Sequence, residues 1–140
     1  MTAAAPVADA AAEGRKRLLR ILWGLAILAV IVGSLLPGDS TPIQMLGHLD
    51  VSDKIQHFGA YAVLAFLPAI HERRKFVLRA ALFAVALGIG LEFGQLESPG
   101  RDFEVGDMVA DALGVCLGLL VGIPLRASSL VRTFLCASSR

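Results

Sequence analysis

Residues 106–125 read GDMVADALGVCLGLLVGIPL, and this stretch decides the class of fold. Its only charged residues are Asp107 and Asp111, both near its start. A helix of about 20 apolar residues is long enough to cross the hydrocarbon core of a bilayer. The stretch therefore predicts a transmembrane helix with an acidic beginning.

Three further apolar runs precede this one, and together they predict four spans, at residues 18–37, 52–70, 76–95 and 106–125. Pro37-Gly38 ends the first run, and no small-x-small cleavage site follows closely, so this run is interpreted as a span and not as a removed signal. We expect an all-α integral membrane four-helix bundle over residues 18–125. Residues 1–17 are expected to form a disordered tail. Residues 126–140 are expected to form a second tail, either an interfacial amphipathic helix or a frayed end.

Composition agrees with a membrane protein and argues against several other classes. Hydrophobic residues make up 56% of the 140 residues and charged residues only 18%, with a mean hydropathy of +0.69. So few charges poorly cover the surface of a soluble domain of this size. The net charge of +1 gives no large basic field for nucleic acid. The bilayer is thus the first expected partner, and nucleic acid is not expected.

Charge asymmetry predicts the orientation of the bundle. All of the 13 basic residues except Lys54 and Arg101 lie before or in the first turn of the first span, between the second and third spans or in the first turn of the third, or after the fourth. Basic residues accumulate on the cytoplasmic side of membrane proteins. We therefore expect both termini in the cytoplasm of a bacterial cell, with the protein in the cytoplasmic membrane.

Polar residues gather at the opposite ends of the predicted spans. Asp53, His57 and Tyr61 follow each other at four-residue intervals and share a helical face. The polar residues expected to form a ligand-binding site facing the periplasm or the outside are Asp53, Lys54, His57, Tyr61, Glu92, Gln95, Arg101, Asp107 and Asp111. Several have simpler interpretations: Asp107 as a helix N-cap, Tyr61 as an interfacial aromatic, and His57 as an interface residue.

Small residues predict which helices pack together. Gly114, Gly118 and Gly122 recur every four residues on the fourth span, and Gly88 lies in a stripe of small residues on the third. Such stripes let helix backbones approach closely. We expect the third and fourth spans to pack against each other through these faces, which would bring their polar ends together.

Asp111 has the least ordinary position of the acidic residues. It lies about one turn inside the fourth span, where an ionised carboxylate facing lipid is costly. It should therefore face the bundle and have a partner. Lys54, His57 and Arg101 are the cationic candidates on that side.

These residues together resemble the motifs of VanZ-like membrane proteins. The first motif is Asp53-Lys54-x-x-His57-x-x-x-Tyr61-x-x-Leu64. The second is Glu92-x-x-Gln95, then Arg101, then Asp107-x-x-x-Asp111-x-x-Gly114-x-x-x-Gly118. The resemblance covers roughly residues 50–120 and implies a small multispan membrane protein. The namesake of that family is linked to resistance against teicoplanin, although many VanZ-like chains occur without a resistance cassette. The family pattern commonly has Asn where this chain has Asp111.

Three functions fit the sequence. The first is binding or modulation of an envelope lipid or a glycopeptide-type amphiphile at the polar site. The second is an enzyme acting on a lipid-linked envelope substrate, with His57 as general acid or base, or with a divalent cation held among His57, Glu92, Asp107 and Asp111. The third is a structural accessory protein in which the polar residues clamp the helix ends. The sequence does not identify a cofactor. A second copy of the chain is a further candidate partner.

Overall fold

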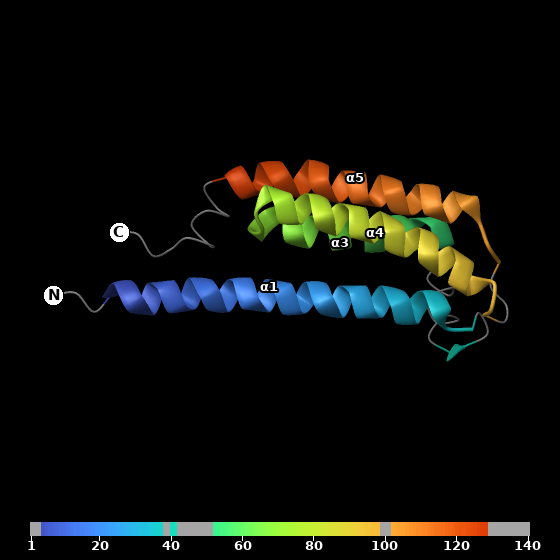
Figure 1. Ribbon diagram of the computed structural model, residues 1–140, viewed down its shortest axis with the longest axis horizontal. Coiled ribbons are helices and arrows are strands. Elements are labelled where there is room, and N and C mark those ends of the chain that lie inside the picture. Colours follow the sequence, from blue (N-terminus) through green and yellow to red (C-terminus); the bar gives the residue numbers. More distant parts are fainter. Residues whose placement is uncertain (1–3, 38–39, 42–51, 99–101, 129–140) are drawn as a thin grey trace.

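The computed structural model describes residues 4–37, 40–41, 52–98 and 102–128. Four long helices account for nearly all of this part of the chain, and it contains no strand (Figure 1). They are α1 (Ala4–Leu35), α3 (Asp53–His71), α4 (Arg74–Gln95) and α5 (Val105–Ala127). The all-α class predicted from the sequence is confirmed.

The helix bounds agree with the predicted spans except at the N-terminus. Helix α1 begins at Ala4, so residues 4–17, expected to be a disordered tail, form its first part. This expectation was wrong because the segment is rich in alanine, the strongest helix former, and Glu13 adds an ion pair with Lys16 at 3.0 Å. Residues 129–140, which hold most of the predicted C-terminal tail, lie outside the described residues.

Three of the four helices are long and apolar enough to cross a membrane: α1 over Ala12–Leu35, α4 and α5. Their outward faces carry large apolar side chains, such as Leu82 and Leu120, which are 64% and 72% exposed. A continuous exposed surface of this kind is suited to lipid. The chain is therefore a multi-pass membrane protein.

Helix α3 is not among the three helices that are long and apolar enough to cross a membrane, and its first two turns carry Asp53, Lys54 and His57. Its buried residues include Tyr61, Leu64 and Ala65, which form the core together with residues of α4 and α5. With 19 residues, it is about 28 Å long at 1.5 Å per residue. The polar start of α3 is thus followed by turns whose inner face is covered by neighbouring helices.

The glycines of α5 pack against α3. A Cβ atom at Gly114 would overlap the Phe58 carbonyl oxygen, one at Gly118 would overlap the Ala62 carbonyl oxygen, and one at Gly122 would lie 2.6 Å from the Ala69 Cβ. The prediction that this stripe packs against the third predicted span, which is α4, was wrong. Its neighbour is α3, which is the second predicted span. Helix α3 offers small residues at the matching positions, and a glycine stripe indicates a close approach without selecting the neighbour.

Helix α1 is attached to α3 and α4 by polar contacts near its middle and near its end. The Trp23 Nε1 atom donates a hydrogen bond to the Leu64 carbonyl oxygen of α3 at 2.9 Å. Near its end, the Gln95 Nε2 atom donates to the Ser34 carbonyl oxygen at 3.2 Å. The N-terminus of α1 and the C-terminus of α5 lie toward the same end of the bundle (Figure 1).

The helix ends form two groups. At one end, which we call the acidic end, are the last turns of α1 and α4 and the first turns of α3 and α5. At the other, which we call the basic end, Arg20 of α1 reaches Glu72, which follows α3, and Arg126 of α5 reaches the same residue. The polar residues singled out by the sequence therefore lie far from most of the basic ones.

Candidate functional site

At the acidic end, a lysine of α3 binds two carboxylates at the start of α5. Lys54, in the first turn of α3, has its Nζ atom 3.2 Å from the Asp107 Oδ1 atom of α5 and also bonded to the Glu104 carboxylate. The Asp107 side chain is 5% exposed, whereas that of Lys54 is half exposed. The lysine lowers the pKa of the exposed Glu104 carboxyl through their hydrogen bond. Its charge is thus already shared between two carboxylates.

One turn deeper, a histidine meets the aspartate that was hardest to explain from the sequence. The His57 Nδ1 atom lies 2.9 Å from the Asp111 Oδ1 atom, and the two side chains are 10% and 2% exposed. Since a carboxylate oxygen only accepts, the imidazole donates this bond. The expectation that Asp111 faces the bundle and has a cationic candidate as its partner is met by His57.

The second oxygen of Asp111 has a different environment. Its Oδ2 atom is buried and accepts no hydrogen bond from any residue that the structure describes. It lies against Gly88 of α4, where a Cβ atom would overlap it. The missing side chain at Gly88 therefore gives the carboxylate its place between α4 and α5. An unpaired buried oxygen of this kind calls for an explanation.

The two polar residues of α4 face different neighbours. Glu92 is 1% exposed, and its Oε2 atom accepts a hydrogen bond from the Glu104 backbone N–H at 3.1 Å. Gln95 is 2% exposed, and its amide is engaged with the Ser34 carbonyl of α1. Glu92 therefore ties down the segment that leads into α5, whereas Gln95 joins α4 to α1.

Tyr61 lies behind the histidine, one turn further along α3. It is 1% exposed, and its ring is parallel to that of His57 with 6.5 Å between the ring centroids. Tyr61 is therefore a core residue that backs the imidazole. Arg101, the remaining predicted site residue, lies outside the described residues.

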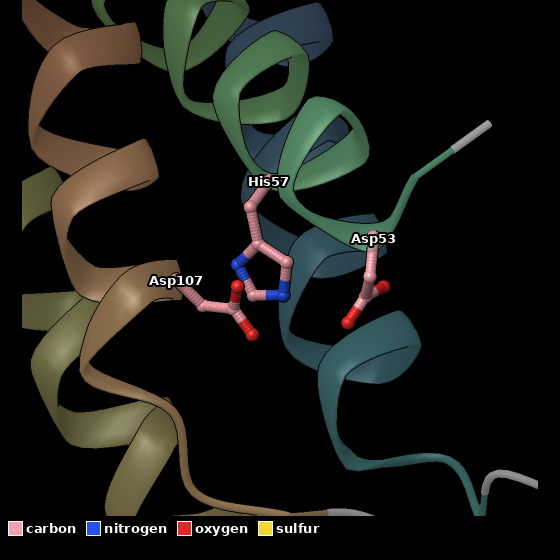
Figure 2. A group of neighbouring side chains, drawn as sticks. All are labelled: Asp53, His57 and Asp107. Atoms are coloured by element: carbon pink, nitrogen blue, oxygen red, sulfur yellow. The ribbon is translucent and has the colours of Figure 1, made fainter.

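Three side chains at the acidic end are close enough together to be the ligands of one metal ion. Figure 2 shows the His57 imidazole between the carboxylates of Asp53 and Asp107. One ligand atom from each residue lies within 4.8 Å of the other two. The sequence grouped His57 and Asp107 with Glu92 and Asp111 instead, whereas this geometry brings in Asp53. Two carboxylates and one imidazole are a donor set suited to a divalent cation.

Glu104 is a residue of the acidic end that was not predicted from the sequence. It binds Lys54 through its side chain and Glu92 through its backbone N–H. A signal was present, because Glu104 stands three residues before Asp107, directly ahead of the helix. Its pairing with a lysine 50 residues earlier in the chain could only be seen in the fold.

A comparison with protein families identifies the chain. The model of the VanZ/LLP1 family matches residues 16–126. The chain belongs to the VanZ/LLP1 family. Comparisons with curated proteins and with solved structures gave no match. In this VanZ/LLP1 chain, the matched region includes all four helices except the start of α1 and the last residue of α5.

Proposed function

We propose that this VanZ/LLP1 chain binds the headgroup of a cell-envelope amphiphile, either a lipid or a glycopeptide-type antibiotic, at the acidic end of its bundle. The observation that carries the proposal is the Asp111 carboxylate, which is buried next to His57 with one oxygen unpaired. Keeping such a group in a membrane protein is costly, and intramembrane ionisable residues commonly mark functional sites.

The charges at the acidic end indicate which part of an amphiphile would bind. Carboxylates of Asp53 and Asp107 lie next to His57, which binds Asp111, and Glu92 is a further buried carboxylate at this end. Lys54, the nearby lysine, is already engaged by Glu104 and Asp107. A site with this excess of carboxylates favours a cationic group, so the proposed ligand carries an ammonium group that can donate hydrogen bonds.

The test is a choice between two lipids with identical acyl chains. Native mass spectrometry of the full-length protein, released from mild detergent, would be run with equal amounts of phosphatidylethanolamine and phosphatidylcholine. Only the first has ammonium N–H donors. We expect phosphatidylethanolamine adducts to predominate several-fold, Asp111→Asn to remove this preference, and Glu97→Gln to keep it. Glu97 is a matched control because it is an exposed carboxylate at the same end. An unchanged preference in Asp111→Asn would contradict the proposal.

The proposal also places the protein in the bacterial cytoplasmic membrane, with the acidic end outside and both termini inside. The support is the concentration of arginine and lysine at the basic end. A chain whose native cysteines are replaced by serine would carry one new cysteine, at exposed Glu97 or at exposed Arg74. In intact cells, an impermeant maleimide is expected to label the first and not the second. The reverse pattern would overturn the orientation.

A second function is favoured by the spacing of Asp53, His57 and Asp107. These side chains could hold a divalent cation for a membrane-embedded enzyme acting on a lipid-linked substrate, in which the ion would polarise a phosphoryl oxygen. This alternative predicts that Mn²⁺ added to the purified protein binds in isothermal titration calorimetry and that Asp107→Asn abolishes the heat. The absence of binding by the wild-type protein would exclude it.

A further inference from the structure

The basic end contains a cavity that the proposed function does not use. It has a volume of about 870 Å³, which is within the range of ligand-binding clefts. Residues from the first half of α1, the end of α3, the beginning of α4 and the end of α5 line it. Its cationic lining residues are Lys16, Arg20, Arg73 and Arg126.

Two of these cations are already neutralised by carboxylates. Lys16 pairs with Glu13 of its own helix at 3.0 Å. The Arg20 Nε atom donates to the Glu72 Oε1 atom at 2.6 Å. Glu72 is 8% exposed and therefore acts as a fixed anchor for the arginine. The two remaining nitrogen atoms of that guanidinium have no part in this bond, so the anchored Arg20 keeps donors for a ligand.

The other two cations carry uncompensated charge. The Arg126 Nη1 atom donates to the backbone carbonyl of Glu72, a bond that orients the guanidinium without neutralising it. Arg73 has no carboxylate partner among the described residues and is the N-cap of α4, whose first N–H groups add a partial positive charge. The cavity therefore has a surplus of about two positive charges, and the guanidinium of Arg126 is held in place by its bond to the Glu72 carbonyl.

The lining of the cavity also includes two large apolar side chains that are exposed on the surface of the bundle. They are Phe76 and Ile123, which are 39% and 53% exposed. Phe76 is held by the edge-to-face contact of its ring with Trp23, at 5.7 Å between centroids. A ligand with a phosphate and an adjoining hydrocarbon chain fits this combination, because guanidinium groups bind phosphate by charge and paired hydrogen bonds.

We propose that this cavity binds the phosphate of an anionic phospholipid from the adjacent leaflet, with the first carbons of its acyl chains against Phe76 and Ile123. The site is independent of the acidic end and of its ligand. The arginine residues at the basic end of the bundle are already expected to help determine the orientation of the protein in the membrane. The proposal adds that Arg73 and Arg126 act at one position, which distinguishes them from neighbouring basic residues.

The test compares two double variants that remove the same charge from the same end. Native mass spectrometry would measure binding of phosphatidylglycerol against phosphatidylcholine with identical chains. Arg73→Gln with Arg126→Gln should lower the preference for phosphatidylglycerol at least tenfold, since losing one hydrogen bond between charged groups costs on the order of tenfold in affinity. Arg74→Gln with Arg79→Gln, which do not line the cavity, should change it less than twofold. Equal losses in both doubles, or no preference in the wild type, would overturn the proposal.

Two further arms separate folding and ligand source from binding. The single variant Arg73→Gln changes an exposed N-cap with no side-chain capping bond, so it should fold normally and still lose preference for phosphatidylglycerol. Glycerol 3-phosphate, which has the phosphate without the acyl chains, should not displace the lipid at millimolar concentration. If it does displace the lipid, the cavity is a site for soluble phosphates and the lipid assignment is wrong.

Discussion

The acidic and basic ends of the bundle both carry charged side chains, but they hold them in different surroundings. At the acidic end, Asp107 and Asp111 are 3% and 2% exposed and bind residues of another helix. At the basic end, the side chain of Arg20 is 60% exposed even though it is paired with Glu72. Exposed arginine residues are explained by membrane orientation. Buried carboxylates are not, which is why the acidic end is the stronger candidate for the principal site.

The largest effect is expected where α3 and α5 touch, because both ends depend on this contact. Gly114→Ala places a Cβ atom against the Phe58 carbonyl and should cost about 3 kcal/mol of unfolding free energy, the upper part of the usual range for overpacking. Gly90→Ala is the matched control, because nothing lies within 4 Å of a Cβ atom there. Thermal unfolding in detergent measures both. Equal stability of the two variants would show that the close approach of α3 and α5 is not needed.

The next effect concerns the buried pair at the acidic end. Asp111→Ala leaves the His57 imidazole without its acceptor and should cost about 2 kcal/mol, as expected for a buried polar group that has lost its partner. Chemical or thermal unfolding checks the value. A variant as stable as the wild type would mean that the histidine finds another partner or that Asp111 is held at the site at a cost to stability.

A smaller effect is expected for the corresponding anchor at the basic end. Glu72→Ala removes the carboxylate that binds Arg20, but solvent can take over much of that arginine's hydrogen bonding because the side chain is exposed. The loss of stability should therefore be smaller than that of Asp111→Ala in the same unfolding assay. A larger loss would contradict the contrast between the two ends.

The smallest effect is expected for the exposed ion pair of Lys54 and Glu104. Because this pairing lowers the pKa of Glu104 from its ordinary 4.5, its contribution to stability is present above that pH and disappears as the pH falls through the lowered value. Glu104→Gln should thus slightly lower the unfolding midpoint at pH 7 and lower it less at an acidic pH well below 4.5. Glu97→Gln serves as a control. A loss of the same size at both pH values would show that the ion pair is not responsible.

Much of the fold could be predicted from the sequence because an apolar run of about 20 residues indicates a membrane-spanning helix. The helices at 53–71, 74–95 and 105–127 agree with the predicted spans to within two residues. The partner of the glycine stripe could not be predicted, since Gly114 and Gly118 indicate only that some backbone comes close. Alanine-rich residues 4–17 were predicted as a tail because their hydropathy is low, although alanine has a high helix propensity and the segment is helical.

The candidate site, like the fold, could be predicted only in part from the sequence. Helical spacing grouped Asp53, His57 and Tyr61 on one face, and the structure has His57 and Tyr61 stacked. Spacing within a helix could not decide that His57 bonds Asp111, or that Gln95 bonds Ser34, because these contacts join residues 54 and 61 positions apart. The cavity at the basic end was missed for that reason too, since four separate segments line it.

The most direct test of the central claim is the thermal unfolding of wild-type protein and Asp111→Asn in nanodiscs of phosphatidylethanolamine and of phosphatidylcholine. A ligand that binds the folded state raises its stability. If Asp111 binds the ammonium headgroup, we expect a higher unfolding temperature for the wild type in phosphatidylethanolamine than in phosphatidylcholine, and no such difference for Asp111→Asn. The same difference in both proteins would show that the buried carboxylate does not bind the headgroup, and the acidic end would then be a clamp between helices.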